Sequence, residues 1–179
     1  MRKFLLATFA GALVSCGQAT DTDATKVDAS QAGGAESPKA AAASGGDPCT
    51  LVSDPEAVFG TAVSVNVKTM PNGSRMCVWQ SAEGRTCGTV TVLGPGWSEL
   101  LDVPRNYAGM VTSLGAFGSP KELAGVGEEA QIVDGGILGV QIAFRTSKAA
   151  VNVGAGCGEN TEARVAMAER LARAVAAKL

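Results

Sequence analysis

The sequence predicts an α+β domain: a mostly antiparallel sheet with helices packed on one side, in the order α-β-β-β-α-β-β-β-α. Apolar and polar residues alternate in short segments, which is the period of half-buried strands. Several of these segments are joined by connections of hairpin length, which favour antiparallel pairing. Segments with helix-start signals or a helical apolar stripe flank the strands and divide them into two groups.

The first helix is expected where the folded part begins. Ser53 can cap the free amides, Glu56 completes a capping box, and Pro55 stands in the first turn, where its missing N–H costs nothing. Gly60 ends this helix. The first group of strands is expected at 62–68, 76–80 and 86–93, and the turn at 81–84 joins the last two as a hairpin.

The second helix is expected from Pro104 to about Leu114, because several apolar residues in that range are spaced for one helical face. The second group of strands follows at 130–134, 137–145 and 149–153. Asn160 or Thr161 caps the final helix. Its apolar stripe, which should cover the sheet, consists of Val165, Ala168, Leu171, Ala172, Val175 and Leu179.

Residues 1–15 predict a lipoprotein signal peptide. Arg2 and Lys3 are basic, and the apolar run that follows is too short to span a bilayer as a helix. The segment Leu13-Val14-Ser15-Cys16 resembles the lipobox of bacterial lipoproteins, in which the cysteine thiol is acylated and cleavage makes that cysteine the first residue. The alternative is a plain secretory peptide cleaved near Ala19. Both interpretations predict export.

Residues 16–46 are expected to be the lipidated Cys16 followed by a disordered tether. This stretch consists mainly of small and polar residues, which cannot bury enough apolar surface to offset the entropy of ordering the chain. As a flexible coil it would span roughly 30 Å. Residues 47–179 then form a single α+β domain, because their number is sufficient for one core.

The net charge of −2 is distributed without blocks of one sign. This argues against nucleic acid as a partner and against polybasic attachment to anionic lipid. Membrane attachment is therefore expected through acyl chains on Cys16, a palmitate-type lipid anchor facing the periplasm or the exterior. If the cell has two membranes, Gly17 in place of Asp after the cysteine resembles the sorting signal for the outer one.

Four cysteines follow Cys16, and an even number in an oxidising compartment favours two disulfides. Their spacing lacks the close C-x₂₋₄-C clip of zinc sites, and the chain has no histidine, so no metal site and no cofactor are expected. Three pairings are possible. Cys77 with Cys87 is one of them, because a hairpin centred near Ala82 would place these residues opposite one another.

Short motifs support a resemblance that covers most of residues 47–179. They are the opening 47–60 with its Asp-Pro-Cys, the segment Cys77-Val78-Trp79, and the segment 123–130 with its Gly-Val-Gly-Glu. The chain resembles a family of small bacterial secreted lipoproteins of unknown function, best represented in actinobacteria, although Val52 replaces the usual Leu. The resemblance implies that Cys49 pairs with Cys77. By elimination, Cys87 then pairs with Cys157.

Few residues offer a route to catalysis. The commonest hydrolase triads need a histidine base, which this chain lacks. Ser147-Lys148 falls in a predicted hairpin turn, where polar residues are expected. Glu128 and Glu129 are expected to belong to a solvated loop and to point to opposite sides. The protein is therefore expected not to be an enzyme.

Aromatic residues are scarce, and a binding surface is expected around Trp97, Arg105 and Tyr107, because Trp and Tyr combine stacking area with a polar tip. Trp79 is expected in the core beside Cys77. The sequence thus favours a lipid-anchored envelope protein that acts as a non-catalytic binding module for an unidentified envelope protein or small ligand. A carrier or sensor of a small apolar ligand is the alternative, and an envelope enzyme is the third possibility.

Overall fold

A computed structural model describes residues 46–179, all of which belong to one compact unit. The expected signal peptide, the lipidated Cys16 and most of the expected tether lie outside the described residues. The described part has the α+β character that the sequence predicts, since a mostly antiparallel sheet is combined with three α-helices.

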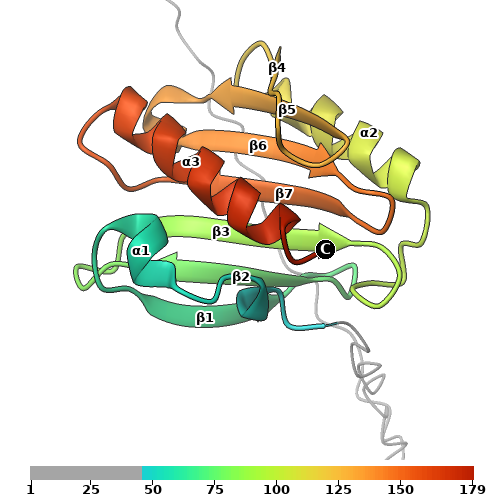
Figure 1. Ribbon diagram of the computed structural model, residues 1–179, viewed down its shortest axis with the longest axis horizontal. Coiled ribbons are helices and arrows are strands. Elements are labelled where there is room, and N and C mark those ends of the chain that lie inside the picture. The colour runs from blue at the N-terminus through green and yellow to red at the C-terminus, as the bar shows by residue number, and fades with distance from the viewer. Residues whose placement is uncertain (1–45) are drawn as a thin grey trace, which may run out of the picture. The chain divides into compact units, whose positions relative to one another are not determined.

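The sheet has seven strands in the order β1-β2-β3-β7-β6-β5-β4, and every neighbouring pair is antiparallel (Figure 1). The strands are β1 (Ser64–Thr69), β2 (Arg75–Gln80), β3 (Thr86–Leu93), β4 (Lys121–Glu122), β5 (Glu129–Asp134), β6 (Val140–Arg145) and β7 (Ala150–Ala155). Six of them lie close to the expected ranges, and β4 is an addition. The strand expected to begin at 137 begins at Val140 instead, because Gly136 and Gly139 take positive φ angles and form a tight turn before it.

Every helix of the described residues except η2 begins directly after a residue whose side chain caps it. They are η1 (Pro48–Leu51), α1 (Pro55–Phe59), α2 (Val103–Leu114), the short η2 (Gly136–Leu138) and α3 (Thr161–Ala176). The α1 cap is Asp54, whose carboxylate accepts from the amide of Ala57 at 3.0 Å, so the expected capping by Ser53 is wrong by one residue. Asp102 and Asn160 cap α2 and α3 in the same way.

The helices lie on both faces of the sheet, so the expectation that they pack on one side is wrong. The α3 helix crosses one face, where it packs with Ile142 and Val151, and α1 lies on the same side (Figure 1). The α2 helix packs on the opposite face with Ala143 and Ala150, the neighbours of those residues in β6 and β7. Successive strand residues point to opposite faces, and these small alanines leave room for a helix.

The core beneath α3 is closely packed. Trp79, Phe144 and Leu171 are fully buried, and the rings of Phe59 and Trp79 lie 5.6 Å apart. Gly88 marks the tightest approach, because a Cβ atom there would lie 2.5 Å from the Phe59 ring. The burial of Trp79 confirms the expectation from the sequence.

Two disulfides join the core to its surrounding segments. Cys49 is bonded to Cys77 and Cys87 to Cys157, with Cα–Cα distances of 5.1 Å and 4.4 Å, and these are the two expected pairs. The alternative pairing of Cys77 with Cys87 does not occur. Cys77 lies opposite Val90, and the register shifts between Trp79 and Gln80, where Cys87 has no partner residue in β2.

Candidate functional site

The structure does not bring Trp97, Arg105 and Tyr107 together. Each lines a different surface pocket of the described residues. Arg105 and Tyr107 are two residues apart on α2, which corresponds to about 200° around the helix, so they lie on opposite flanks. The expected single surface is therefore three separate places.

Trp97 packs against the first described residues and is partly buried against the main core. The amide of Gly46 donates to the carbonyl of Gly96 at 2.7 Å, and a Cβ atom on Gly46 would lie 2.9 Å from the Trp97 ring. This indole thus holds the first described residues against the domain. A packing role explains its position, whereas the sequence suggested a side chain with little commitment to the core.

The Tyr107 groove is an open pocket of about 940 Å³ between α2 and the start of β5. The α2 wall consists of Pro104, Tyr107, Ala108 and Val111. The opposite wall consists of Glu122, Leu123, Ala124, Glu128, Glu129, Ala130, Gln131 and Arg145. Three carboxylates and one guanidinium thus share the groove with several apolar side chains.

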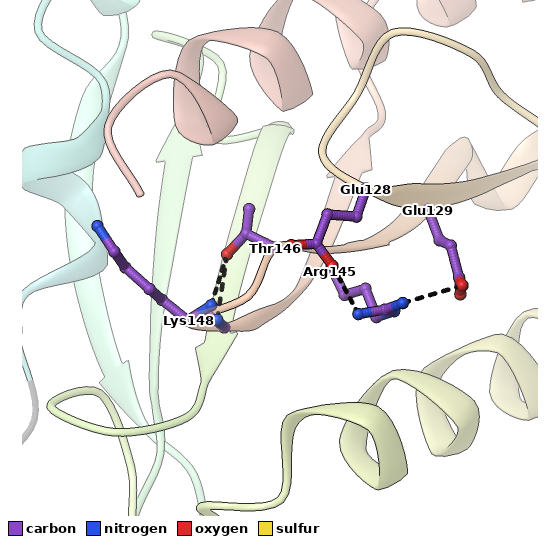
Figure 2. A network of polar contacts seen from close by, with 6 residues as sticks. Glu128, Glu129, Arg145, Thr146 and Lys148 are labelled. Atoms are coloured by element: carbon purple, nitrogen blue, oxygen red, sulfur yellow. Dashed lines mark hydrogen bonds and ion pairs between the residues drawn. The ribbon is translucent and has the colours of Figure 1, made fainter.

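Arg145 lies between two glutamates at the centre of this wall (Figure 2). Its Nη1 donates to Oε2 of Glu128 at 2.7 Å and its Nη2 donates to Oε1 of Glu129 at 3.0 Å. The expectation that Glu128 and Glu129 point to opposite sides is wrong. Glu128 precedes β5, and Gly127 turns the chain there with a φ of +58°, so the alternation of a strand does not yet apply.

The ion pairs shift the acidity of the groups involved. The hydrogen bond from Arg145 lowers the pKa of Glu129 below its ordinary value, and the same hydrogen bond raises the pKa of Arg145. Both side chains therefore remain charged across the physiological pH range. Each glutamate uses one oxygen for Arg145, and within residues 46–179 the other oxygen of each has no hydrogen-bond partner.

Tyr107 is the aromatic residue of the α2 wall of the groove. The residue is 8% exposed, and burial raises the pKa of its phenol, with a smaller contribution from the negative charge of Glu129. Among the described residues its hydroxyl has no hydrogen-bond partner, and this oxygen is accessible to solvent although the residue as a whole is buried. The groove therefore presents an unused donor and acceptor beside two partly unused carboxylates.

The loop that carries Ser147 and Lys148 is a turn, as expected. Thr146 Oγ1 accepts from the amides of Lys148 and Ala149, each at 3.2 Å, and the Lys148 side chain points away from Arg145 (Figure 2). Nothing in this turn places the serine hydroxyl on the lysine amine.

Comparisons with known proteins give no relative: no family model matches the chain, and no curated protein or solved structure matches it. Within residues 46–179, no helix has the length and apolar character needed to cross a membrane. The same residues contain no group of three or more side chains placed to hold a metal ion. A functional assignment therefore depends on the geometry of the Tyr107 groove.

Proposed function

We propose that the protein is a lipid-anchored, non-catalytic binding module of the cell envelope. Its folded domain binds a cationic group flanked by apolar surface, such as a basic segment of another envelope protein, in the Tyr107 groove. The observation that carries this proposal is the buried Tyr107 with its unpartnered hydroxyl, set beside carboxylates that outnumber the single guanidinium.

The charges of the groove favour a cation. Three carboxylates line the pocket, and the single positive charge of Arg145 balances only one of their three negative charges, although its guanidinium bonds to two of them. A guanidinium or ammonium group in the groove would find acceptors in the free oxygens of Glu128 and Glu129 and in the Tyr107 hydroxyl. Such hydrogen bonds are stronger than those between neutral groups, because one partner is ionised.

The apolar part of the groove favours a ligand whose charged group is flanked by apolar groups. Pro104 and Val111 line the α2 wall, and Leu123 faces them across the pocket. An isolated inorganic cation would leave these side chains in water. An extended basic segment with apolar neighbours would cover them, and their burial would add about 25 cal/mol for each Å² removed from water.

The packing of the domain supports a surface site more than an internal carrier. The space between the sheet and the helices α1 and α3 is filled by Trp79, Phe144 and Leu171. At Gly88 even a methyl group would meet the Phe59 ring. A small apolar ligand would have to displace these side chains to enter that part of the core.

The lipid anchor is a separate part of the proposal, supported by the sequence around Cys16. Cys16→Ser should abolish labelling of the protein by a fatty-acid analogue and release or stall the precursor. Continued labelling of this variant would contradict the anchor. Membrane fractionation of a cell with two membranes then tests the expected residence in the outer one.

Calorimetry with two matched peptides tests the groove in the full chain. The probes are acetyl-Leu-Arg-Leu-amide and its citrulline counterpart, which has a similar shape but no charge. The arginine peptide should bind more tightly, and added salt should weaken its binding. Glu122→Gln combined with Glu129→Gln should remove this preference. Glu83→Gln combined with Glu159→Gln, at the other end of the sheet, should leave it unchanged.

Each result has a distinct meaning. Equal binding of both peptides, unaffected by the glutamine substitutions, would support recognition of an apolar ligand and contradict the role of charge. No binding of either peptide would contradict the groove as a site for a basic segment. Neither result depends on whether Cys16 is acylated.

A further inference from the structure

The two edge strands of the sheet, β4 and β1, differ in length and in the side chains that they carry. The edge strand β4 has two residues, Lys121 and Glu122, and both are charged. The edge strand β1 has six residues, most of them exposed, and 51% of the Val65 surface is accessible to solvent. Short, charged edges resist pairing with another strand, whereas long edges with β-branched residues favour it.

Hydrogen bonds at the turns show which backbone groups β1 leaves free. The amide of Met70 donates to the carbonyl of Ser74 at 2.8 Å, so residue 70 points toward β2. Because this direction alternates along a strand, the even-numbered residues of β1 bond to β2 and the odd-numbered ones point outward. The β2–β3 hairpin agrees with this assignment. The amide of Ser81 donates to the carbonyl of Arg85, so the odd-numbered residues of β2 bond toward β3 and the even-numbered ones bond toward β1. The outward residues are Val65, Val67 and Thr69.

Several antiparallel registers pair outward residues of two β1 copies, and the one centred on Val67 pairs all three of them. With Val67 opposite the second copy's Val67, Val65 lies opposite Thr69, and each outward residue donates and accepts one hydrogen bond. In this register Lys68 lies opposite Asn66, so the two lysines do not face each other. The two Val67 side chains lie side by side on the face that carries Cys77.

We propose that two copies of this chain associate through β1, in the register that places Val67 opposite Val67, to form one continuous antiparallel sheet. The association ends at two copies, because a two-fold contact uses the same edge of both copies and the short, charged β4 edge remains outside. This inference does not depend on the Tyr107 groove, which lies near the opposite edge of the sheet.

A single strand pair is a small interface, below the roughly 1,200 Å² of stable soluble complexes, so the dimer should be weak in dilute solution. Tethering two copies to the same membrane would raise their effective concentration and favour pairing. The appropriate measurements therefore cover a wide range of protein concentration.

Sedimentation velocity and amide hydrogen exchange of the purified full chain in mild detergent test the proposal. The sedimentation coefficient should rise with protein concentration toward that of a dimer and no further. Exchange at Val65, Val67 and Thr69 should slow over the same concentration range. The even-numbered amides of β1 should be protected at every concentration, because they already bond to β2.

Val67→Pro is the critical variant. It removes an outward N–H and keeps the hydrogen bonds between β1 and β2, so the variant should remain monomeric with native disulfides. The matched control is Val67→Thr, which keeps the N–H and the β-branched shape and should still form the dimer. If Val67→Pro does not fold, the sedimentation coefficient and amide exchange of the natural protein, measured against concentration, still decide whether the dimer forms.

Three results would overturn the proposal. The first is a protein that stays monomeric at every concentration. The second is association that Val67→Pro leaves intact. The third is protection of the outward amides that does not change with concentration, which would indicate that another segment of the same chain covers the edge.

Discussion

Removing the two disulfides one at a time should destabilise the domain by different and calculable amounts. The bond between Cys49 and Cys77 closes a loop with a sequence separation of 28, and that between Cys87 and Cys157 closes one of 70. In the chain-entropy model these loops correspond to about 3.6 kcal/mol and about 4.4 kcal/mol. Replacing both cysteines of a pair by alanine should lower the free energy of unfolding by these amounts.

The two loops do not overlap in sequence, so their entropic contributions should add. The loss of both bonds should then cost about 8 kcal/mol, which is comparable to the whole stability of a typical domain of about 5–15 kcal/mol. The protein without disulfides should therefore be marginally folded or unfolded. Urea unfolding of the full chain, followed by tryptophan fluorescence without reductant, measures each difference.

A larger loss from removing the Cys49–Cys77 bond than from removing the Cys87–Cys157 bond would contradict this reasoning. Cys77 and Cys87 are both fully buried, so the cavities left by alanine are similar and should not reverse the order. Detection of a Cys77–Cys87 peptide in the natural protein would contradict the framework itself.

Three further predictions concern single positions. Glu129→Gln should lower the pKa of Tyr107 toward its ordinary value of 10.0, because it removes a negative charge that disfavours the phenolate; absorbance at alkaline pH measures this, and a pKa that stays the same or rises would contradict it. Gly88→Ala should lower the free energy of unfolding by about 1–3 kcal/mol through overpacking, whereas Gly109→Ala on the exposed side of α2 should raise it by about 0.5–1 kcal/mol. Urea unfolding measures both changes, and changes of the same sign would contradict the packing described here. Trp97→Ala should lower the free energy of unfolding by about 2 kcal/mol, which is less than the loss expected for a fully buried aromatic residue. An unchanged thermal midpoint would show that the indole is not part of the core.

The sequence predicted the strands well where alternation is strong and adjacent turns are marked by glycine. The range of β3 was predicted residue for residue, because Val90 and Val92 alternate with threonines before Gly94. The side on which α2 packs was not predictable from its own stripe. It depends on Ala143 and Ala150, whose small side chains leave room on a face that alternation alone does not distinguish from the other.

The site was predicted less well than the fold. The sequence predicted Tyr107 as part of a binding surface, but its neighbours in the groove come from the start of β5 and the end of β6. Arg145 is separated from Glu128 by 17 residues, and only the antiparallel pairing of β5 with β6 brings them together. The turn at Gly127, which lets both glutamates reach one guanidinium, was the available signal in the sequence.

The most direct test of the proposed function is the titration of Tyr107 with peptide bound. It is the only tyrosine in the chain, so tyrosinate absorbance reports on this groove alone, and an arginine side chain keeps its charge through the titration. Saturating acetyl-Leu-Arg-Leu-amide should lower the pKa of Tyr107 below the value measured with the citrulline peptide, because a bound cation stabilises the phenolate. The same pKa of Tyr107 with both peptides would contradict the binding of a cation in the Tyr107 groove.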